Sequence, residues 1–179
     1  MPTIISHAIV PIALGLGLGK NFISTRLLWA GALASILPDF DVVTFRMGID
    51  YAHEFGHRGA SHSLVFALGL AILAIIFCRQ LRASPLAAFV FILVATASHG
   101  LLDMFTNGGL GVSLFWPFHE ARLFFPTQVI EVSPLSVRRF FSLRGMSVIL
   151  SELIWVWLPC FVVSISLYFW RRKRSLDEA

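Results

Sequence analysis

The sequence predicts an all-α protein, a polytopic membrane helix bundle of about five transmembrane helices. Apolar residues make up 57% of the 179 residues and charged residues 13%, against roughly 45–50% and 25% in soluble proteins. The mean hydropathy is +0.80. A chain of this length cannot bury so much apolar surface in its own core, so lipid must cover part of that surface. We expect residues 1–179 to form a single membrane-embedded domain.

Five apolar stretches are the candidate transmembrane helices, although several are shorter than the roughly 20 residues that span a bilayer. They cover residues 4–19, 27–37, 64–78, 85–102 and 147–170. The first has no basic segment before it and no small-residue cleavage site after it, so we interpret it as a retained helix. The last is followed by Arg171, Arg172, Lys173 and Arg174. Such a basic stop predicts a cytoplasmic tail over residues 171–179.

Five crossings from a cytoplasmic C-terminus place the N-terminus outside. The predicted inner side then carries eight lysines and arginines and the outer side six, in the direction of the positive-inside rule. Residues 106–146 become a long outer loop between the fourth and fifth helices. This topology also places every polar cluster described next at one face of the membrane.

Four short polar clusters interrupt the apolar sequence. They contain His7, then Asp39 and Asp41, then His57, Arg58 and His62, and finally His99 and Asp103. Buried imidazoles and carboxylates are costly unless something compensates them, and a divalent metal compensates both. We therefore predict a metal site where the four clusters meet.

The spacing within the clusters supports this convergence. His99 and Asp103 are four residues apart and lie one turn apart on one helix face, where they can chelate a metal or orient one another. A turn at Gly59 with Ser61 as N-cap would place His62 in the first turn of the third helix.

Proline influences the second cluster. Pro38 disturbs the end of the second helix, so we expect Asp39 and Asp41 to follow in a loop where both carboxylates can turn inward. By the same pattern, His57 is expected in the loop before the third helix.

The order of these residues resembles the LexA-regulated, inner-membrane-bound metal-dependent hydrolase (YdjM-like) family. The resemblance covers about residues 1–118. It rests on His7, Pro38-Asp39-Phe40-Asp41, His57-Arg58-Gly59-Ala60-Ser61-His62-Ser63, Ser98-His99-Gly100-Leu101-Leu102-Asp103, Thr106 and Gly109. It implies a bacterial inner-membrane location and metal-dependent hydrolase activity, and in such a membrane the predicted topology makes the N-terminus periplasmic. More distantly, the clusters look like the zinc-dependent phospholipase C and P1 nuclease superfamily, which cleaves phosphoesters, although not every ligand of that superfamily has a counterpart here.

These observations assign a role to each candidate residue. The predicted metal ligands are His7, Asp39, His57, His62, His99 and Asp103. We expect a metal-activated water to attack the substrate, with Asp41 as general base and Arg58 stabilising charge on the non-bridging oxygens. Cys78 and Cys160 lie in apolar stretches without CxxC spacing, which leaves nitrogen and oxygen ligands. Zinc is the leading metal, with manganese or iron as alternatives.

Each cluster also has a structural alternative. His7 can be a hydrogen-bonded helix-end residue, and Asp39 and Asp41 can form a turn. Arg58 can simply pair with Asp39, Asp41 or Glu54. His53 and His119 fall outside the motifs and are expected in solvated loops.

Glu152 is an acid inside the last helix, where an ionisable residue indicates function by default. Its position near the start of that helix also allows it to reach the interface or to pair with Arg144. The glycines of residues 15–19 are typical of a close-packed helix face rather than a nucleotide-binding loop.

The predicted outer loop mixes aromatic residues with arginines, and three prolines break any long helix in it. This composition suits the lipid headgroup layer, so we expect membrane lipids as partners and an amphiphilic or lipid-derived substrate. We expect no nucleic acid.

Rival functions use similar residues. A non-catalytic structural or sensor site needs the same ligands as a hydrolase. A metal transporter would place them near the bilayer midplane, with access from both sides, and a di-haem bundle would not need the aspartates.

Overall fold

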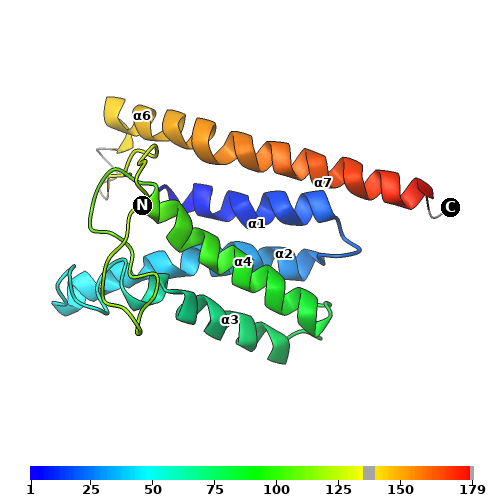
Figure 1. Ribbon diagram of the computed structural model, residues 1–179, viewed down its shortest axis with the longest axis horizontal. Coiled ribbons are helices and arrows are strands. Elements are labelled where there is room, and N and C mark those ends of the chain that lie inside the picture. The colour runs from blue at the N-terminus through cyan, green and yellow to red at the C-terminus, as the bar shows by residue number, and fades with distance from the viewer. Residues whose placement is uncertain (135–139, 178–179) are drawn as a thin grey trace.

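The computed structural model describes residues 1–134 and 140–177, which form an elongated bundle of helices (Figure 1). The main helices are α1 (Ile4–Leu18), α2 (Thr25–Ile36), α3 (Leu64–Ile76), α4 (Pro85–Met104), α6 (Leu143–Glu152) and α7 (Leu158–Asp177). Two 3₁₀ helices, η1 (Leu37–Met47) and η2 (Ala60–His62), and a π-helical stretch, η3 (Leu153–Trp157), complete them. The described residues contain isolated β-bridges but no strand. The predicted all-α class is confirmed.

The helices run back and forth along the long axis of the bundle (Figure 1). Helix α1 packs between α2 and α7, and α4 packs on α2 and α3. The starts of α1, α3 and α6 therefore lie at the same end of the bundle as the ends of α2 and α4. The α1–α2 and α3–α4 turns and the end of α7 lie at the opposite end.

Serine and threonine fix the starts of these helices. The side chains of Thr3, Ser24, Ser63, Ser84 and Ser142 each accept a hydrogen bond from a backbone N–H in the first turn of the helix that follows, as N-caps do. The cap of α3 is Ser63, so the prediction that Ser61 caps this helix is wrong. Ser63 precedes an uninterrupted apolar run, whereas the residues before it form the separate turn η2.

Small residues let the helices approach closely. A Cβ atom on Gly17 would lie 2.8 Å from the Ser164 carbonyl oxygen and 2.8 Å from the Leu167 Cβ atom, so the contact between α1 and α7 requires glycine there. Gly15 lies instead against Leu28 of α2, so these two glycines allow close packing on different sides of α1 and do not form the single predicted face. Between α2, α3 and α4 the buried cluster is likewise rich in alanine, including Ala71 and Ala88.

Among the described residues, three helical segments have the length and apolar composition to cross a membrane: Thr25–Met47, Pro85–Met104 and Leu143–Asp177. Ile4–Leu18 and Leu64–Ile76 are shorter apolar helices. Large side chains such as Leu16, Trp29 and Ile76 are more than 60% exposed on the outside of the bundle, as expected for a surface that contacts lipid. The number of crossings, predicted as five, stays a prediction.

The second polar cluster is more regular than expected. Asp39 and Asp41 lie in the 3₁₀ helix η1, not in a loop. Pro38 occupies the first turn of η1, where a missing N–H is tolerated. Helix α2 ends at Ile36, beside the proline as expected, and the chain continues as the 3₁₀ helix η1 instead of a loop.

Two further boundaries differ from the prediction. Helix α7 continues to Asp177, so the predicted tail is helical as far as the structure describes it, because its arginines, lysine and leucine favour helix and no glycine or proline interrupts them. Helix α6 begins at Leu143, inside the predicted outer loop of residues 106–146. Arg138 and Arg139 of that loop lie outside the described residues.

Glu152 connects the last helix to the start of the first. Its carboxylate is buried and accepts hydrogen bonds of 2.6 Å from the Thr3 N–H, the Thr3 hydroxyl and the Ser6 hydroxyl. The Trp157 indole N–H also donates to Ser6, at 2.8 Å. Arg144 pairs with Glu131 at 3.0 Å, so the alternative pairing of Glu152 with Arg144 is wrong.

We predict that Glu152→Ala lowers the free energy of unfolding by roughly 3 kcal/mol, because three donors lose a charged acceptor inside the protein. Thermal unfolding in detergent measures this. Glu120→Ala removes the same charge from an exposed position and is expected to change stability by no more than about 0.5 kcal/mol. Equal effects of the two substitutions would contradict the proposed contact.

Candidate metal centre

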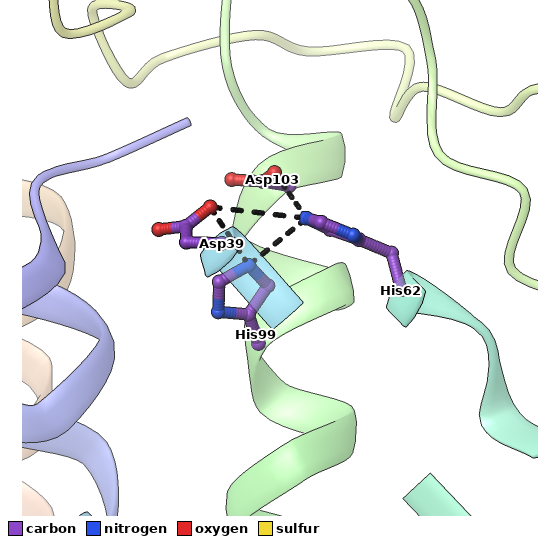
Figure 2. Close-up of side chains that lie close together, drawn as sticks. All are labelled: Asp39, His62, His99 and Asp103. Carbon is purple, nitrogen blue, oxygen red and sulfur yellow. Dashed lines mark hydrogen bonds and ion pairs between the residues drawn. The ribbon is translucent and has the colours of Figure 1, made fainter. Parts of the chain in front are cut away.

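Four predicted ligands meet at the end of the bundle where the polar clusters were expected (Figure 2). Asp39 comes from η1, His62 from η2, and His99 and Asp103 from successive turns of α4. None of the four residues is more than 3% exposed. The four-residue spacing in α4 therefore delivers both side chains to one site.

The facing atoms of this group are close together. His99 Nε2 lies 3.0 Å from His62 Nε2 and 3.3 Å from Asp39 Oδ1. His62 Nε2 lies 3.4 Å from Asp103 Oδ2 and 3.9 Å from Asp39 Oδ1. One nitrogen or oxygen from each residue lies within 4.8 Å of all the others, so a single cation has room to contact all four.

His7 borders the same group. Its ring stacks on His99, with ring centroids 3.7 Å apart. His7 Nε2 lies 3.6 Å from Asp103 Oδ1 and 3.8 Å from Asp39 Oδ2. The structure thus places His7 where a fifth donor would be, beside the four residues that converge most closely.

The buried polar atoms of this centre are not satisfied by the protein. Both nitrogens of His7 and the carboxylate oxygens of Asp39 and Asp103 lack a hydrogen-bond partner in residues 1–134 and 140–177. Such groups are rare in folded proteins because burying them unpaired is costly. A divalent cation would satisfy His7 Nε2 and the two carboxylates at once, so the residues present fit a metal.

Two contacts orient the imidazoles from behind. His99 Nδ1 lies 2.6 Å from the Ser35 carbonyl oxygen, which can only accept a hydrogen bond, so Nδ1 carries the proton and Nε2 keeps its lone pair for the centre. His62 Nδ1 lies 3.2 Å from Asp41 Oδ2. Support of this kind from a carbonyl or carboxylate is usual behind metal-binding histidines.

Asp41 and His57 stand behind the central group. Asp41 lies 2.5 Å from His57 Nδ1 and accepts hydrogen bonds from the Ser61 hydroxyl and the Arg58 N–H at 2.7 and 3.2 Å. Asp41, His57 and His62 form a second group with metal-binding spacing, but the Asp41 oxygens already have donors. The predicted role of Asp41 as general base and the predicted role of His57 as metal ligand stay predictions. The geometry favours a role for Asp41 in orienting the His62 ring.

The centre carries negative charge that favours a cation. Burial alone would lower the pKa of His62, but the contacts of its ring with the Asp103 and Asp41 carboxylates outweigh burial and raise the pKa to about 9. The carboxylates around His62 therefore favour positive charge at this position.

Arg58 is fully buried and ties the centre to the loop that covers it. Its Nε lies 3.0 Å from Asp103 Oδ2, and its terminal nitrogens donate to the Gly108 and Leu110 carbonyls and the Thr106 hydroxyl. The side chain thus makes three hydrogen bonds from its terminal nitrogens, and its Nε contributes an ion pair to Asp103. Its backbone φ of 63° is left-handed, a conformation that costs roughly 1–2 kcal/mol.

These contacts change the interpretation of Arg58. Its side chain pairs with Asp103. The alternative expectation, a pairing with Asp39, Asp41 or Glu54, is therefore wrong. The predicted oxyanion role stays a prediction, while the observed contacts make Arg58 a positioning residue for Asp103.

A loop over residues 105–134 closes this end of the bundle. Its backbone bonds to itself and to the end of α4, as in Asn107 N–H to the Ile130 carbonyl (3.0 Å) and Phe125 N–H to the Met104 carbonyl (2.9 Å). Phe118 is 85% exposed, as expected for a ring in the headgroup layer. Arg122 donates to backbone carbonyls of residues 51, 53, 57 and 111, so it holds the loop and is not free for lipid phosphate.

Sequence reasoning missed two supports of the centre. The Ser35 carbonyl has no sequence signal, because every residue has one. Gly100 lies against η2, where a Cβ atom would be 2.7 Å from the His62 carbonyl oxygen, and only its place beside His99 in the motif pointed to it. His53 and His119 are exposed, as expected.

The profile of the family described as YdjM inner membrane protein matches residues 1–174 of the chain. The chain belongs to this family. It is 45% identical over 174 residues to "Inner membrane protein YbcI" of Escherichia coli (strain K12), an alignment that covers 97% of this chain and 100% of that relative. No solved structure matches the chain.

Membership of the YdjM family confirms the resemblance and extends it. The match runs well past residue 118, through the covering loop and α7, so the family is defined over nearly the whole bundle. All the predicted site residues lie inside the matched range. The distant similarity to phospholipase C stays a prediction.

We predict that Asp41→Asn weakens zinc binding by about 10–100-fold, because the amide no longer orients His62 as a carboxylate does. Asp39→Asn should weaken binding further, since it removes a donor of the central group. Competition with a chromophoric chelator in detergent measures both, with the exposed Asp50→Asn as control. If Asp41→Asn binds zinc as tightly as the control does, the orienting role is wrong.

Proposed function

We propose that this YdjM-family protein is a membrane-bound, metal-dependent hydrolase that acts on a phosphoester or lipid-derived substrate. The observation that supports this most is the convergence of two imidazoles and two carboxylates with unsatisfied buried atoms. The group contains no sulfur ligand. Structural zinc sites commonly use cysteine, whereas hydrolytic sites use histidine and carboxylates.

Asp39, His62, His99 and Asp103 would hold the metal, with His7 as a fifth donor. When bound, a divalent cation such as zinc, manganese or iron supplies Lewis acidity and lowers the pKa of water.

The other residues position these ligands. The Ser35 carbonyl and the Asp41 carboxylate fix the protonated nitrogens of His99 and His62. Arg58 holds Asp103 and links it to the covering loop. Asp41 reaches the centre only through His62, so we assign it to orientation of that ring and not to direct proton transfer.

The covering loop supports an amphiphilic substrate. Phe115 and Phe118 are exposed on it, at 48% and 85%, at the end of a bundle whose sides are apolar. Aromatic rings in this position suit the bilayer interface. A substrate that reaches the centre from this side would come from the lipid headgroup layer.

The metal centre belongs on the periplasmic side in this proposal. Arg171 to Arg174 lie at the opposite end of the bundle (Figure 1), and basic residues favour the cytoplasmic side. A transporter is disfavoured because the ligands gather at one end and not midway along the helices.

One observation favours a second candidate, a metal site that staples helix ends without catalysis. The four central residues and His7 are at most 3% exposed, and structural metal sites are closed. This candidate and the hydrolase share the same ligands and differ in whether substrate enters.

Metal content tests what both candidates share. We expect detergent-purified wild type to contain about one equivalent or more of zinc, manganese or iron by mass spectrometry, since the buried donors need a cation. His99→Ala/Asp103→Ala should lose it, and the exposed pair His53→Ala/His119→Ala should keep it. Wild type that stays metal-free after reconstitution would disprove the metal centre.

Hydrolysis separates the two candidates. We expect the protein to cleave bis(p-nitrophenyl) phosphate or a short-chain phospholipid in micelles, with activity lost on chelation and restored by metal. The His53→Ala/His119→Ala variant serves as the active control. A metal-loaded protein that cleaves neither substrate would favour the stapling site.

A further inference from the structure

The end of the bundle opposite the metal centre is strongly basic. The α1–α2 turn, the α3–α4 turn and the end of α7 bring together Lys20, Arg26, Arg79, Arg82, Arg171, Arg172, Lys173 and Arg174 (Figure 1). Among residues 1–134 and 140–177, Asp177 is the acidic residue on these segments. The local charge is therefore far from balanced.

Two hollows open into this basic end. One, of about 440 Å³, lies between the two turns and is lined by Lys20, Asn21, Ser24, Arg79, Arg82 and Ser84 among others. The second, of about 540 Å³, is lined by Lys20 and Asn21 together with Tyr168, Arg171, Arg172 and Ser175. Lys20 and Asn21 thus belong to both hollows.

The walls of the hollows are held in place by the protein. The Ser24 hydroxyl donates to the Leu81 carbonyl, and Arg26 Nη1 donates to the Gln80 carbonyl at 3.0 Å. These contacts join the α1–α2 turn to the α3–α4 turn. Hydrogen bonds between the two turns therefore fix the walls of the first hollow.

The cations around the hollows have no partner of opposite charge. Within the part of the chain that the structure describes, no ion pair involves Lys20, Arg79, Arg82 or Arg171. The positive-inside rule explains why basic residues lie on this side of a membrane. It does not explain why they surround two hollows.

An apolar groove continues from the first hollow along the helices. This groove, of about 330 Å³, lies between α1, the α1–α2 turn and α4 and is lined by Leu14, Leu18, Val90, Phe91 and Val94 among others. Phe22 and Ala87 line both the groove and the basic hollow. A cationic site at the helix ends therefore leads directly into an apolar channel on the side of the bundle.

We propose that this end of the protein binds an anionic phospholipid. The phosphate would lie in the hollow beside Lys20, Arg79 and Arg82, and an acyl chain would follow the apolar groove along α4. Basic pockets between membrane helices bind anionic headgroups in this way. The groove distinguishes a lipid from a free phosphate ion, which needs the cations alone.

The test measures lipid binding to the detergent-purified full chain by native mass spectrometry. We expect phosphatidylglycerol to bind in preference to phosphatidylcholine. Lys20→Gln should weaken phosphatidylglycerol binding about fivefold, the effect of one basic residue near a headgroup. Lys173→Gln removes the same charge at the same end but lines neither hollow, and it should leave binding unchanged.

A second pair of variants tests the groove. Val90→Trp fills the groove and should reduce phosphatidylglycerol binding, whereas Val65→Trp, on an exposed face of α3 outside the groove, should not. Metal content should stay at the wild-type level in all four variants, which shows that each one folds.

Four results would overturn the proposal. Equal loss in Lys20→Gln and Lys173→Gln would mean that charge acts diffusely. Unchanged binding in Val90→Trp, or inorganic phosphate competing as well as the lipid does, would mean that the site takes a free anion. Equal binding of the two lipids would mean that no anionic headgroup is recognised.

Discussion

Two buried carboxylates that the protein leaves without hydrogen bonds are the constraint on which the rest of this structure depends. Asp39 and Asp103 lie among apolar helix ends, where an uncompensated charge would cost more than any single packing contact returns. They are surrounded by the imidazoles of His7, His62 and His99 and by the Arg58 guanidinium, and Asp39 itself lies in the 3₁₀ helix that follows α2. A cation between these groups would explain why so many polar residues share one end of an oily bundle.

The arrangement around this centre is layered. The ligands come from four separate elements, and each has its own support: Ser35 behind His99, Asp41 behind His62 and Arg58 behind Asp103. Because every support belongs to a different element from its ligand, the elements cannot move independently without disturbing the centre. The site and the packing of the helix ends therefore stabilise each other.

Much of this could be predicted from the sequence. Apolar runs indicate the helices, and the alternation of direction brings His7, Asp39, His62, His99 and Asp103 to one end. The sequence did not predict the 3₁₀ helix that carries Asp39, because proline in a first turn and proline at a helix end look alike. It also did not separate His57 from the central ligands, since only three-dimensional distances show which imidazole nitrogen faces the centre.

The π-helical stretch η3 has a consequence for how the last helix faces its surroundings. Residues five apart on an α-helix point about 140° away from each other, yet Glu152 and Trp157 both hydrogen-bond to Ser6. In a π-helix the hydrogen bonds join residues five apart, so the wider turn brings the side chains of Glu152 and Trp157 to the same side of the helix. This single wider turn sets the rotation of everything that follows, and it decides which side of α7 meets α1 and which side meets lipid.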